Sequence, residues 1–442
     1  MDELQLSEKK RGSSRPRAVT PALEPWREAR RRPRISLLSY LQAAFVWMLY
    51  GASRGFLLAL RNVLWPRRRP SNPRRICIYR KGFIGDTVVA LPAIHLIKAT
   101  YPQADLTLLT SPVHGKFPGA NELLATSGLF NRVHVYLKSD VSGLAKRLSF
   151  LNSMRREHFD IWIELPQELD GPLRHLRNML FARFAAAKWG YGWGFVTTLH
   201  LWASAQSKFM TFQNEVDKLY EIVRRAGIAT SNEIAFPIRC GSVEQALIDR
   251  LLGTNSHPIA ALAPGAKRPL SIWPIERFVE VGRHLASKGF VIVILGGVAD
   301  VATCRAVADG MGDGLAINLA GKTSLIESCE ALRRCALLVC NDSGVQHLAA
   351  AVGTPCVSIF SAHDMPGKWN PYGQQHVVLR ETVECHPCYL TVCPYDNKCL
   401  KLIDASRVIA AVDMTLARSV EKKAGGSDRL TISEPQERRR IA

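Results

Sequence analysis

The chain has 442 residues, of which 47% are hydrophobic, and a formal net charge of +20. This length exceeds that of one ordinary domain, and the apolar content can fill two hydrophobic cores, so we expect two globular domains. Residues 1–75 hold 17 Lys and Arg against 5 Asp and Glu, a net charge of +12, which leaves +8 for the other 367 residues. The basicity therefore belongs mainly to an N-terminal arm, which is expected to approach an anionic surface of phospholipid or nucleic acid.

The eleven cysteines form no regular framework. Their odd number argues against a secreted disulfide scaffold and for a reducing compartment. Seven stand singly in apolar or helical contexts, where buried free thiols are expected: Cys77, Cys240, Cys304, Cys329, Cys335, Cys340 and Cys356.

Residues 1–34 are rich in Arg, Pro, Ser and Glu, and we expect them to form a disordered basic arm. A helix is expected at 35–66, and its first 19 residues carry no charge. A membrane span, a signal peptide, a helix lying in the membrane interface and a soluble packing helix all remain possible. On a helical wheel one side is polar: Ser36, Ser39, Gln42, Tyr50, Ser53, Arg54 and Arg61. The opposite side is apolar: Leu37, Leu41, Phe45, Met48, Ala52, Phe56 and Val63.

This amphipathic pattern favours the in-plane helix. Arginine clusters flank both ends, at 30–34 and 67–69, so charge asymmetry gives a spanning helix no orientation. Trp47 and Trp65 are expected at headgroup depth.

From Arg75 onward, short apolar strands alternate with helical segments. In the first part we expect strands at 76–79, 106–109, 133–137 and 161–164 and a helix at 86–100. In the second part we expect strands at 259–263, 291–295, 316–319, 337–340 and 356–360, and helices at 275–288, 300–311, 324–335 and 345–352. Such alternation predicts parallel sheets with helices on both faces.

The expected fold class is therefore α/β, with two Rossmann-like domains facing a cleft. We place the first domain at 73–240, a linker region at 241–257, the second domain at 258–415 and a disordered tail at 424–442. Ligands of open parallel sheets bind outside the carboxyl ends of the strands, so the cleft is the expected site.

The first candidate motif is the segment 80–86, Arg-Lys-Gly-Phe-Ile-Gly-Asp, between a strand and a helix. Its glycines permit a tight turn, but Arg80 stands where a dinucleotide fingerprint would begin with glycine. Asp86 is expected at the helix N-terminus. Helix capping accounts for an acid there, and a general base facing the cleft is the functional alternative.

The second motif joins a strand ending at Cys340 to the turn Asn341 to His347 and a following helix. Backbone N–H groups at such a helix N-terminus suit a diphosphate. Helix capping alone would account for Asp342 and Ser343. His347 either donates a hydrogen bond to a phosphate oxygen or is a structural histidine.

The third motif, residues 264–269, follows another strand and presents Lys267 and Arg268 at the carboxyl edge of the sheet. A solvated charge pair is the structural interpretation. Residues 321–323 imitate the end of a phosphate-binding P-loop, but Ala316 occupies the position of its leading glycine, so we reject a nucleotide triphosphatase.

A fourth group gathers four cysteines within fifteen residues: Cys385, Cys388, Cys393 and Cys399. Thiolates at this density can bind zinc or an iron–sulfur cluster, but the spacings do not match a zinc ribbon. Free or redox-labile loop thiols are the alternative.

Together these motifs resemble glycosyltransferase family 9, whose known members include ADP-heptose:lipopolysaccharide heptosyltransferases. The resemblance covers roughly residues 75 to 415 and is most specific at 339–344 with 347–355. Supporting segments are 85–86, 91–93, 264–266, 273–274, 319–325 and 369–371. The cysteine cluster also resembles one found in some heptosyltransferases.

The resemblance implies a GT-B fold, with acceptor on the N-terminal domain, nucleotide sugar on the C-terminal domain and inversion at the anomeric carbon. It implies that Asp86 is the catalytic base. Donor-binding residues are then Gly265, Lys267, Arg268, Lys322, Thr323, Asp342, Ser343, Gly344 and His347.

The sequence departs from the family pattern at two points. A basic residue usually precedes the Trp-Pro pair, but here Ser271 and Ile272 do, so Lys267, Arg268 and Lys322 are the candidates to neutralise phosphate. Arg80 and Lys81 replace smaller residues and are expected to add positive charge beside the acceptor.

The expected function is transfer of a sugar, heptose from ADP-heptose, onto a lipopolysaccharide core or related lipid-linked glycan in the bacterial cell envelope. No cofactor or metal is expected beyond the nucleotide-sugar co-substrate, with ADP-sugar preferred. The expected location is the cytoplasmic face of the inner membrane, as a peripheral or monotopic protein. The alternatives are a GT-B enzyme with another sugar nucleotide on a different cell-surface glycan, and a non-catalytic membrane-attached scaffold. Nucleic acid is not an expected partner, because the body lacks aromatic residues interleaved with its basic ones.

Overall fold

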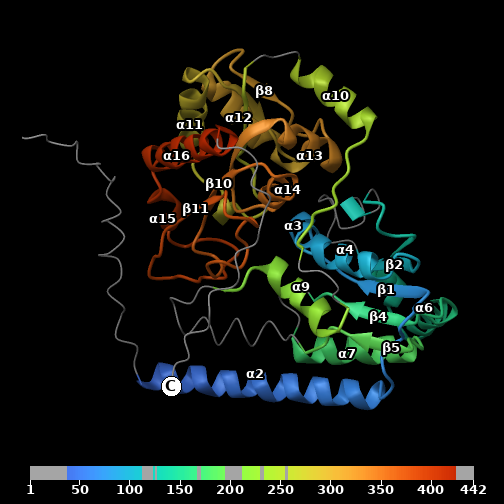
Figure 1. The fold of residues 1–442 in the computed structure, drawn as a ribbon. Helices are drawn as coiled ribbons and strands as arrows, with labels where there is room; N and C mark the ends of the chain where they lie inside the picture. Colours follow the sequence, from blue (N-terminus) through green and yellow to red (C-terminus); the bar gives the residue numbers. More distant parts are fainter. Residues whose placement is uncertain are drawn as a thin grey trace, which may run out of the picture.

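The computed structural model describes residues 37–111, 123–124, 127–166, 171–194, 212–228, 233–253 and 257–424. The predicted disordered arm at 1–34 lies outside these residues, as does the predicted tail at 424–442 except for Ala424, which is helical. Figure 1 shows two α/β domains and a long helix, α2, along one edge of the molecule.

The N-terminal domain is built on a parallel five-stranded sheet in the order β3-β2-β1-β4-β5. Its strands are β1 (Arg75–Tyr79), β2 (Asp105–Thr110), β3 (Arg132–Val135), β4 (Ile161–Glu164) and β5 (Trp189–Tyr191). Its helices are α3 (Ile84–Val88), α4 (Leu91–Thr100), α6 (Leu144–Arg156), α7 (Pro172–Phe184), α9 (Glu215–Arg225) and the short 3-10 helix η1 (Lys138–Val141). The middle strand β1 is buried from Ile76 onward, as expected of a strand covered on both faces.

The C-terminal domain has a parallel six-stranded sheet in the order β11-β10-β9-β6-β7-β8. Its strands are β6 (Ile259–Ala263), β7 (Val291–Ile294), β8 (Ala316–Asn318), β9 (Cys335–Asn341), β10 (Cys356–Phe360) and β11 (Val377–Arg380). Its helices are α10 (Ser242–Leu252), α11 (Ile275–Ser287), α12 (Val301–Met311), α13 (Leu325–Arg333), α14 (Gly344–Val352), α15 (Lys398–Lys401) and α16 (Ala405–Ala424), with 3-10 turns η2 (Pro269–Ser271) and η3 (Val298–Asp300).

The predicted α/β class with two parallel sheets is confirmed, and two local expectations need correction. The single helix expected at 86–100 is two helices, α3 and α4, and Pro92 lies in the first turn of α4, where its missing N–H has no cost. The predicted linker region at 241–257 contains α10, which packs against α13 of the C-terminal domain.

Helix α2 (Leu37–Leu64) forms where the amphipathic helix was expected. Within the described ranges, no helix combines the length and the apolar content that a bilayer crossing requires. The polar side of α2 faces the protein, where Tyr50, Ser53, Arg54 and Arg61 are half-buried. The predicted apolar side instead faces solvent through Leu41, Phe45, Met48, Phe56 and Val63, which are 55–73% exposed.

The two tryptophans of this segment, Trp47 and Trp65, differ in exposure. Trp47 is 39% exposed, but Trp65 is only 4% exposed and stacks on Trp193 in the N-terminal domain. The expectation of Trp65 at headgroup depth is therefore wrong, because its ring and its N–H both have partners inside the protein; the indole Nε1 donates to the carbonyl of Ala187 at 2.8 Å.

Candidate active site between the two domains

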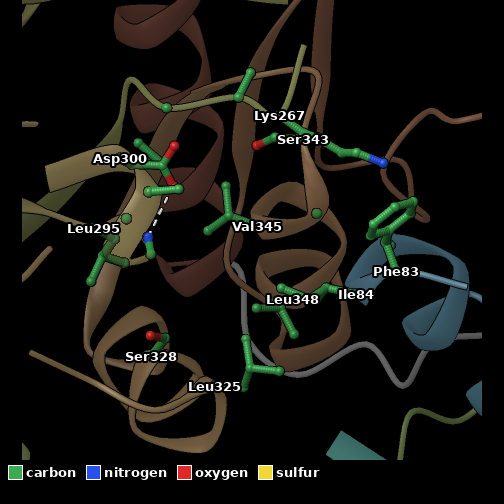
Figure 2. A pocket seen from close by; sticks show the side chains of 18 of the residues that line it. Phe83, Ile84, Lys267, Leu295, Asp300, Leu325, Ser328, Ser343, Val345 and Leu348 are labelled. Atoms are coloured by element: carbon green, nitrogen blue, oxygen red, sulfur yellow. Dashed lines mark hydrogen bonds between the residues drawn. The ribbon is translucent and has the colours of Figure 1, made fainter. Parts of the chain in front are cut away.

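A cavity of about 640 Å³ lies between the two sheets. Its walls come from the segments that follow the carboxyl ends of β1, β6, β7, β8 and β9. Figure 2 shows Phe83 on the N-terminal domain, with Lys267 of the C-terminal domain extended toward it. The predicted site residues that line the cavity are Asp86, Gly265, Lys267, Arg268, Thr323, Asp342, Ser343, Gly344 and His347.

Asp86 lies in the first turn of α3 on the N-terminal wall. Its Oδ2 accepts a hydrogen bond from the N–H of Phe83 at 3.0 Å, so the carboxylate caps the helix. Its Oδ1 lies 3.7 Å from the guanidinium of Arg80, and the side chain is 16% exposed. Burial raises the pKa of Asp86, and Arg80 opposes the rise. The carboxylate thus caps α3 and also borders the cavity, so the two interpretations are compatible.

Arg80 and Lys81 do not line the cavity, and their expected place beside the acceptor stays a prediction. Arg80 is 1% exposed, and its guanidinium donates to the carbonyl of Asp86 and to two carbonyls after β4. It therefore fixes the loop from inside. The ammonium of Lys81 lies over the rings of Tyr79 and Tyr136, at 5.4 and 5.1 Å from their centroids.

Asp342 and His347 lie at the start of α14, on the opposite wall. Burial raises the pKa of Asp342 to about 6, against the attraction of Arg380, and Gln346 donates to its Oδ1 at 3.2 Å. Burial lowers the pKa of His347 to about 4, so its imidazole is neutral at pH 7 and offers one N–H. Ser343 occupies the N-cap position and borders the cavity, and its side chain makes no capping bond to the backbone N–H groups of the first turn.

Lys267 reaches across the cavity. Its ammonium lies 3.0 Å from the centroid of the Phe83 ring, a cation–π contact between the two domains. Burial lowers the pKa of Lys267, followed by repulsion from Arg268, while the nearby Asp86 carboxylate raises it. Arg268 lowers the pKa of Asp342, so its positive charge lies near this carboxylate on the C-terminal wall.

Asn341 holds the C-terminal wall together. Its side-chain amide donates to the carbonyl of Pro264 at 2.7 Å, and its oxygen accepts from the N–H of Trp273 at 3.1 Å. Asn341 is fully buried, so these bonds fix the loop after β6 against the end of β9.

Thr323 and Lys322, both predicted to bind the nucleotide sugar, differ in their position relative to the cavity. Thr323 lines the cavity, and its hydroxyl is hydrogen-bonded to that of Ser328 at 2.9 Å. Lys322 does not line it; the ammonium is exposed to solvent and donates to the carbonyl of Asn318 at 2.9 Å.

The structure adds Asp300 and Trp369 to the cavity. Asp300 accepts from the N–H of Gly297 at 3.0 Å, and burial raises its pKa. A Cβ at Gly265 would lie 2.3 Å from the Asp300 carboxyl carbon, so glycine is required for the approach. Trp369 packs edge-on against His347 at 6.0 Å. The acid at the end of a Gly-Gly turn after β7 was the available sequence signal for Asp300.

The four clustered cysteines are unpaired thiols outside the cavity. Burial raises the pKa of Cys385 and of Cys388. Across the part of the chain that the structure describes, no three His, Cys, Asp or Glu side chains are grouped to hold a metal ion.

The N-terminal and C-terminal walls of the cavity are in close contact at two glycines, Gly85 of α3 and Gly344 of α14. A Cβ at Gly85 would lie 3.1 Å from the ring of His347, and one at Gly344 would lie 3.1 Å from the Cβ of Ile84. Two domains with parallel sheets that face each other across a cavity at the carboxyl ends of their strands have the GT-B architecture.

Residues 147–399 match the sequence family described as glycosyltransferase family 9 (heptosyltransferase), so the chain belongs to this family and is a glycosyltransferase. A relative is lipooligosaccharide heptosyltransferase 2 of Haemophilus ducreyi, 23% identical over 69% of this chain and 88% of that protein.

Two solved structures share the fold. A glycosyltransferase family 9 protein of Veillonella parvula aligns with a TM-score of 0.61 and 21% identity over 79% of this chain and 98% of that one. The E. coli heptosyltransferase WaaC with ADP-2-deoxy-2-fluoro heptose aligns with a TM-score of 0.54 and 18% identity over 77% of this chain and 99% of that one.

Proposed function

We propose that this glycosyltransferase moves a heptose from ADP-heptose onto a lipopolysaccharide core or related lipid-linked glycan, with inversion at the anomeric carbon. The main observation in support is that Asp86 and the Asp342–His347 segment border one cavity from opposite domains. Support for the donor and acceptor comes from the H. ducreyi lipooligosaccharide heptosyltransferase and from WaaC, solved with an ADP-heptose analogue. A different sugar nucleotide and a different surface glycan form the alternative.

In this mechanism Asp86 accepts the proton of the acceptor hydroxyl while that oxygen bonds to the anomeric carbon. The bond between the anomeric carbon and the diphosphate oxygen breaks, and the electron pair leaves with ADP. Burial, which raises the pKa of Asp86, makes its carboxylate a stronger base than an exposed aspartate.

The C-terminal wall would stabilise the leaving diphosphate. Lys267 and Arg268 bring two positive charges to the cavity, and the first turn of α14 supplies backbone N–H groups. Neutral His347 would donate one hydrogen bond to donor oxygens. Asp300 is a carboxylate beside a glycine turn and would accept hydrogen bonds from ribose hydroxyls.

Replacing Asp86 tests the proposal against the scaffold alternative. Asp86→Asn should lower the transfer rate by about 10² to 10⁴, because an amide cannot take the proton, while ADP affinity stays near wild type. Asp140→Asn is a matched control: Asp140 likewise caps a first turn, at Leu137, but lies outside the cavity. Wild-type turnover by Asp86→Asn with saturating substrates would refute the base assignment, and a wild-type enzyme without transfer from any ADP-, UDP- or GDP-sugar would favour the scaffold.

We further propose that α2 lies in the interface of the cytoplasmic face of the inner membrane, where a lipid-linked acceptor is presented. The support is its row of exposed apolar side chains, Leu41, Phe45, Met48, Phe56 and Val63, on a helix with no acidic residue. This face spans about 33 Å of helix, and packing of the opposite side on the domain leaves it outward.

Two apolar-to-polar substitutions test this attachment. Phe45→Gln with Phe56→Gln should move the enzyme from the membrane pellet to the supernatant, whereas Leu148→Gln with Val243→Gln, two exposed positions on α6 and α10, should not. Equal sedimentation of all three proteins would count against the in-plane helix.

A further inference from the structure

A second cavity, of about 410 Å³, lies at the C-terminal end of α2, against β5 and the end of α9. Five arginines line it, and we name it the arginine pocket: Arg61, Arg67, Arg68, Arg69 and Arg225. The ring systems of Trp65, Trp189 and Tyr191 complete its walls. Figure 1 shows this end of α2 beneath the N-terminal domain, near the β5 label.

Two of the arginines are held in place by the fold. Arg61 donates through Nε to the carbonyl of Gly190 at 3.0 Å, and its guanidinium lies 4.7 Å from the centroid of the Trp189 ring. Arg69 donates to the carbonyl of Gly227 at 2.7 Å. Burial lowers the pKa of both Arg61 and Arg69, which keep other N–H groups available beyond these carbonyl bonds.

The positive charge of the pocket is not balanced from within. Among the residues that the structure describes, no carboxylate lines it, and Glu221, the partner of Arg225, also pairs with Arg224. Arg67 and Arg68 are exposed and make no ion pair with any residue that the structure describes. Several guanidinium groups around one cavity without an acid suit a phosphate, which planar guanidinium forks bind in bidentate fashion.

The position of the pocket relative to the apolar face of α2 points to the source of that phosphate. Arg61 lies on the side of the helix away from Val63, the last residue of the apolar face. When an amphipathic helix buries that face by about 5–10 Å, the opposite side of a helix about 10 Å wide stands at headgroup depth. We infer that the arginine pocket binds the phosphate of an anionic phospholipid headgroup, an inference that rests on the proposed in-plane attachment of α2.

Vesicle binding by the full chain tests the pocket separately from the helix. Sedimentation is measured with pure phosphatidylcholine vesicles and with vesicles containing phosphatidylglycerol. The apolar face should give binding to both, and the pocket should add affinity only on the anionic vesicles. Arg67→Gln with Arg68→Gln should weaken the anionic binding about tenfold and leave binding to phosphatidylcholine unchanged. The control, Arg250→Gln with Arg305→Gln, removes two exposed charges from the C-terminal domain and should leave both values near wild type.

A charge-conserving pair distinguishes a built pocket from general attraction. Arg67→Lys with Arg68→Lys retains the charge but not the guanidinium fork, so anionic binding should still fall measurably. Anionic affinity equal to wild type in this pair would overturn the pocket. Wild-type binding to phosphatidylcholine with no gain on phosphatidylglycerol would also overturn it while leaving the in-plane helix intact, whereas binding to neither vesicle would refute both. Displacement from anionic vesicles by single-stranded RNA at low micromolar concentration would reassign the pocket to nucleic acid.

Discussion

Asp86 and Asp342 are carboxylates on opposite walls of one cavity, and each stands beside a different set of charges. Asp86 has Arg80 at 3.7 Å and one oxygen bound to a backbone N–H. Asp342 feels Arg380 and Arg268 as attraction and a second carboxylate, Asp364, as repulsion. Burial dominates at both positions and raises both pKa values, so the charged form of each carboxylate is less stable in the folded enzyme than in water.

Asp342→Asn should therefore stabilise the free enzyme above pH 6. Because the folded-state pKa of about 6 exceeds the ordinary value of 3.8, the stabilising contribution is complete below about pH 4 and is lost as pH rises through 6. The variant should gain on the order of 2–3 kcal/mol over wild type at pH 7.5 and little at pH 4. Urea unfolding at both pH values measures this. A variant that is less stable than wild type at pH 7.5 would contradict the burial argument.

Lys267 and Lys322, which the sequence predicted to bind phosphate, should differ in their effect on the dissociation constant of ADP. Lys267→Met removes a positive charge that lines the cavity, so the dissociation constant of ADP should rise about tenfold. Lys322→Met should leave it within about twofold, because the ammonium of Lys322 is bonded to the carbonyl of Asn318 outside the cavity. Calorimetry with ADP measures both. Equal losses would mean that the Lys322 side chain reorients onto the donor.

At the scale of elements, α3 and α14 meet through glycine backbone. Gly344→Ala would place a Cβ 3.1 Å from the Cβ of Ile84 and 3.3 Å from the N of Gly85, so α3 and α14 must move apart by a few tenths of an ångström. Transfer should fall about ten- to a hundredfold, because the proposed base and the proposed donor site lie on the two walls that move apart. The melting temperature should change little.

Gly55→Ala is the control for this substitution, since a Cβ there meets nothing within 4 Å. Its turnover on a soluble acceptor should match wild type. A fully active Gly344→Ala enzyme would show that the two helices need not approach this closely during transfer.

The sequence predicted elements whose signal is local. Strands β6 and β10 begin and end where the apolar runs do, and α14 follows the polar turn at 341–343 as expected. Local composition could not show that Arg80 turns inward, because its partners lie after β4, some 85 residues away. The orientation of Lys322 depends on one carbonyl, and either direction fits the same sequence.

The amphipathic pattern of α2 was visible in the sequence, but not which face the protein would cover. That choice depends on Arg61 reaching the carbonyl of Gly190 and on Leu57 entering the core of the N-terminal domain. Gly190 and most of the core residues that surround Leu57 lie far from α2 in the sequence. An apolar stripe alone would have predicted the opposite packing.

At the scale of the whole molecule, the domains are tied together beside the cavity. The segment before and within α9 bonds to the loop that follows β10: the N–H of Glu215 donates to the carbonyl of Lys368 at 3.0 Å, and the hydroxyl of Tyr372 donates to Asp217 at 2.9 Å. Together with the cation–π contact of Lys267 on Phe83, these contacts join the two domains next to the cavity. The outward face of α2 would then fix the orientation of the whole cleft at a membrane surface.

Trp65 is the anchor that transmits this orientation, and Trp65→Ala should detach α2 from the body. The ring stacks on Trp193 at 5.1 Å with an interplanar angle of 5°, and its Nε1 bonds to the carbonyl of Ala187. Removing a buried aromatic ring of this size costs about 3–5 kcal/mol, so the urea midpoint followed by circular dichroism should fall clearly. Val63→Ser, at a 73% exposed position two residues earlier, should leave the midpoint within error in solution, because no packing is lost there. If Trp65→Ala unfolds at the wild-type midpoint, the stacking of Trp65 contributes nothing to stability, and Trp65 is not the residue that anchors α2 to the domain.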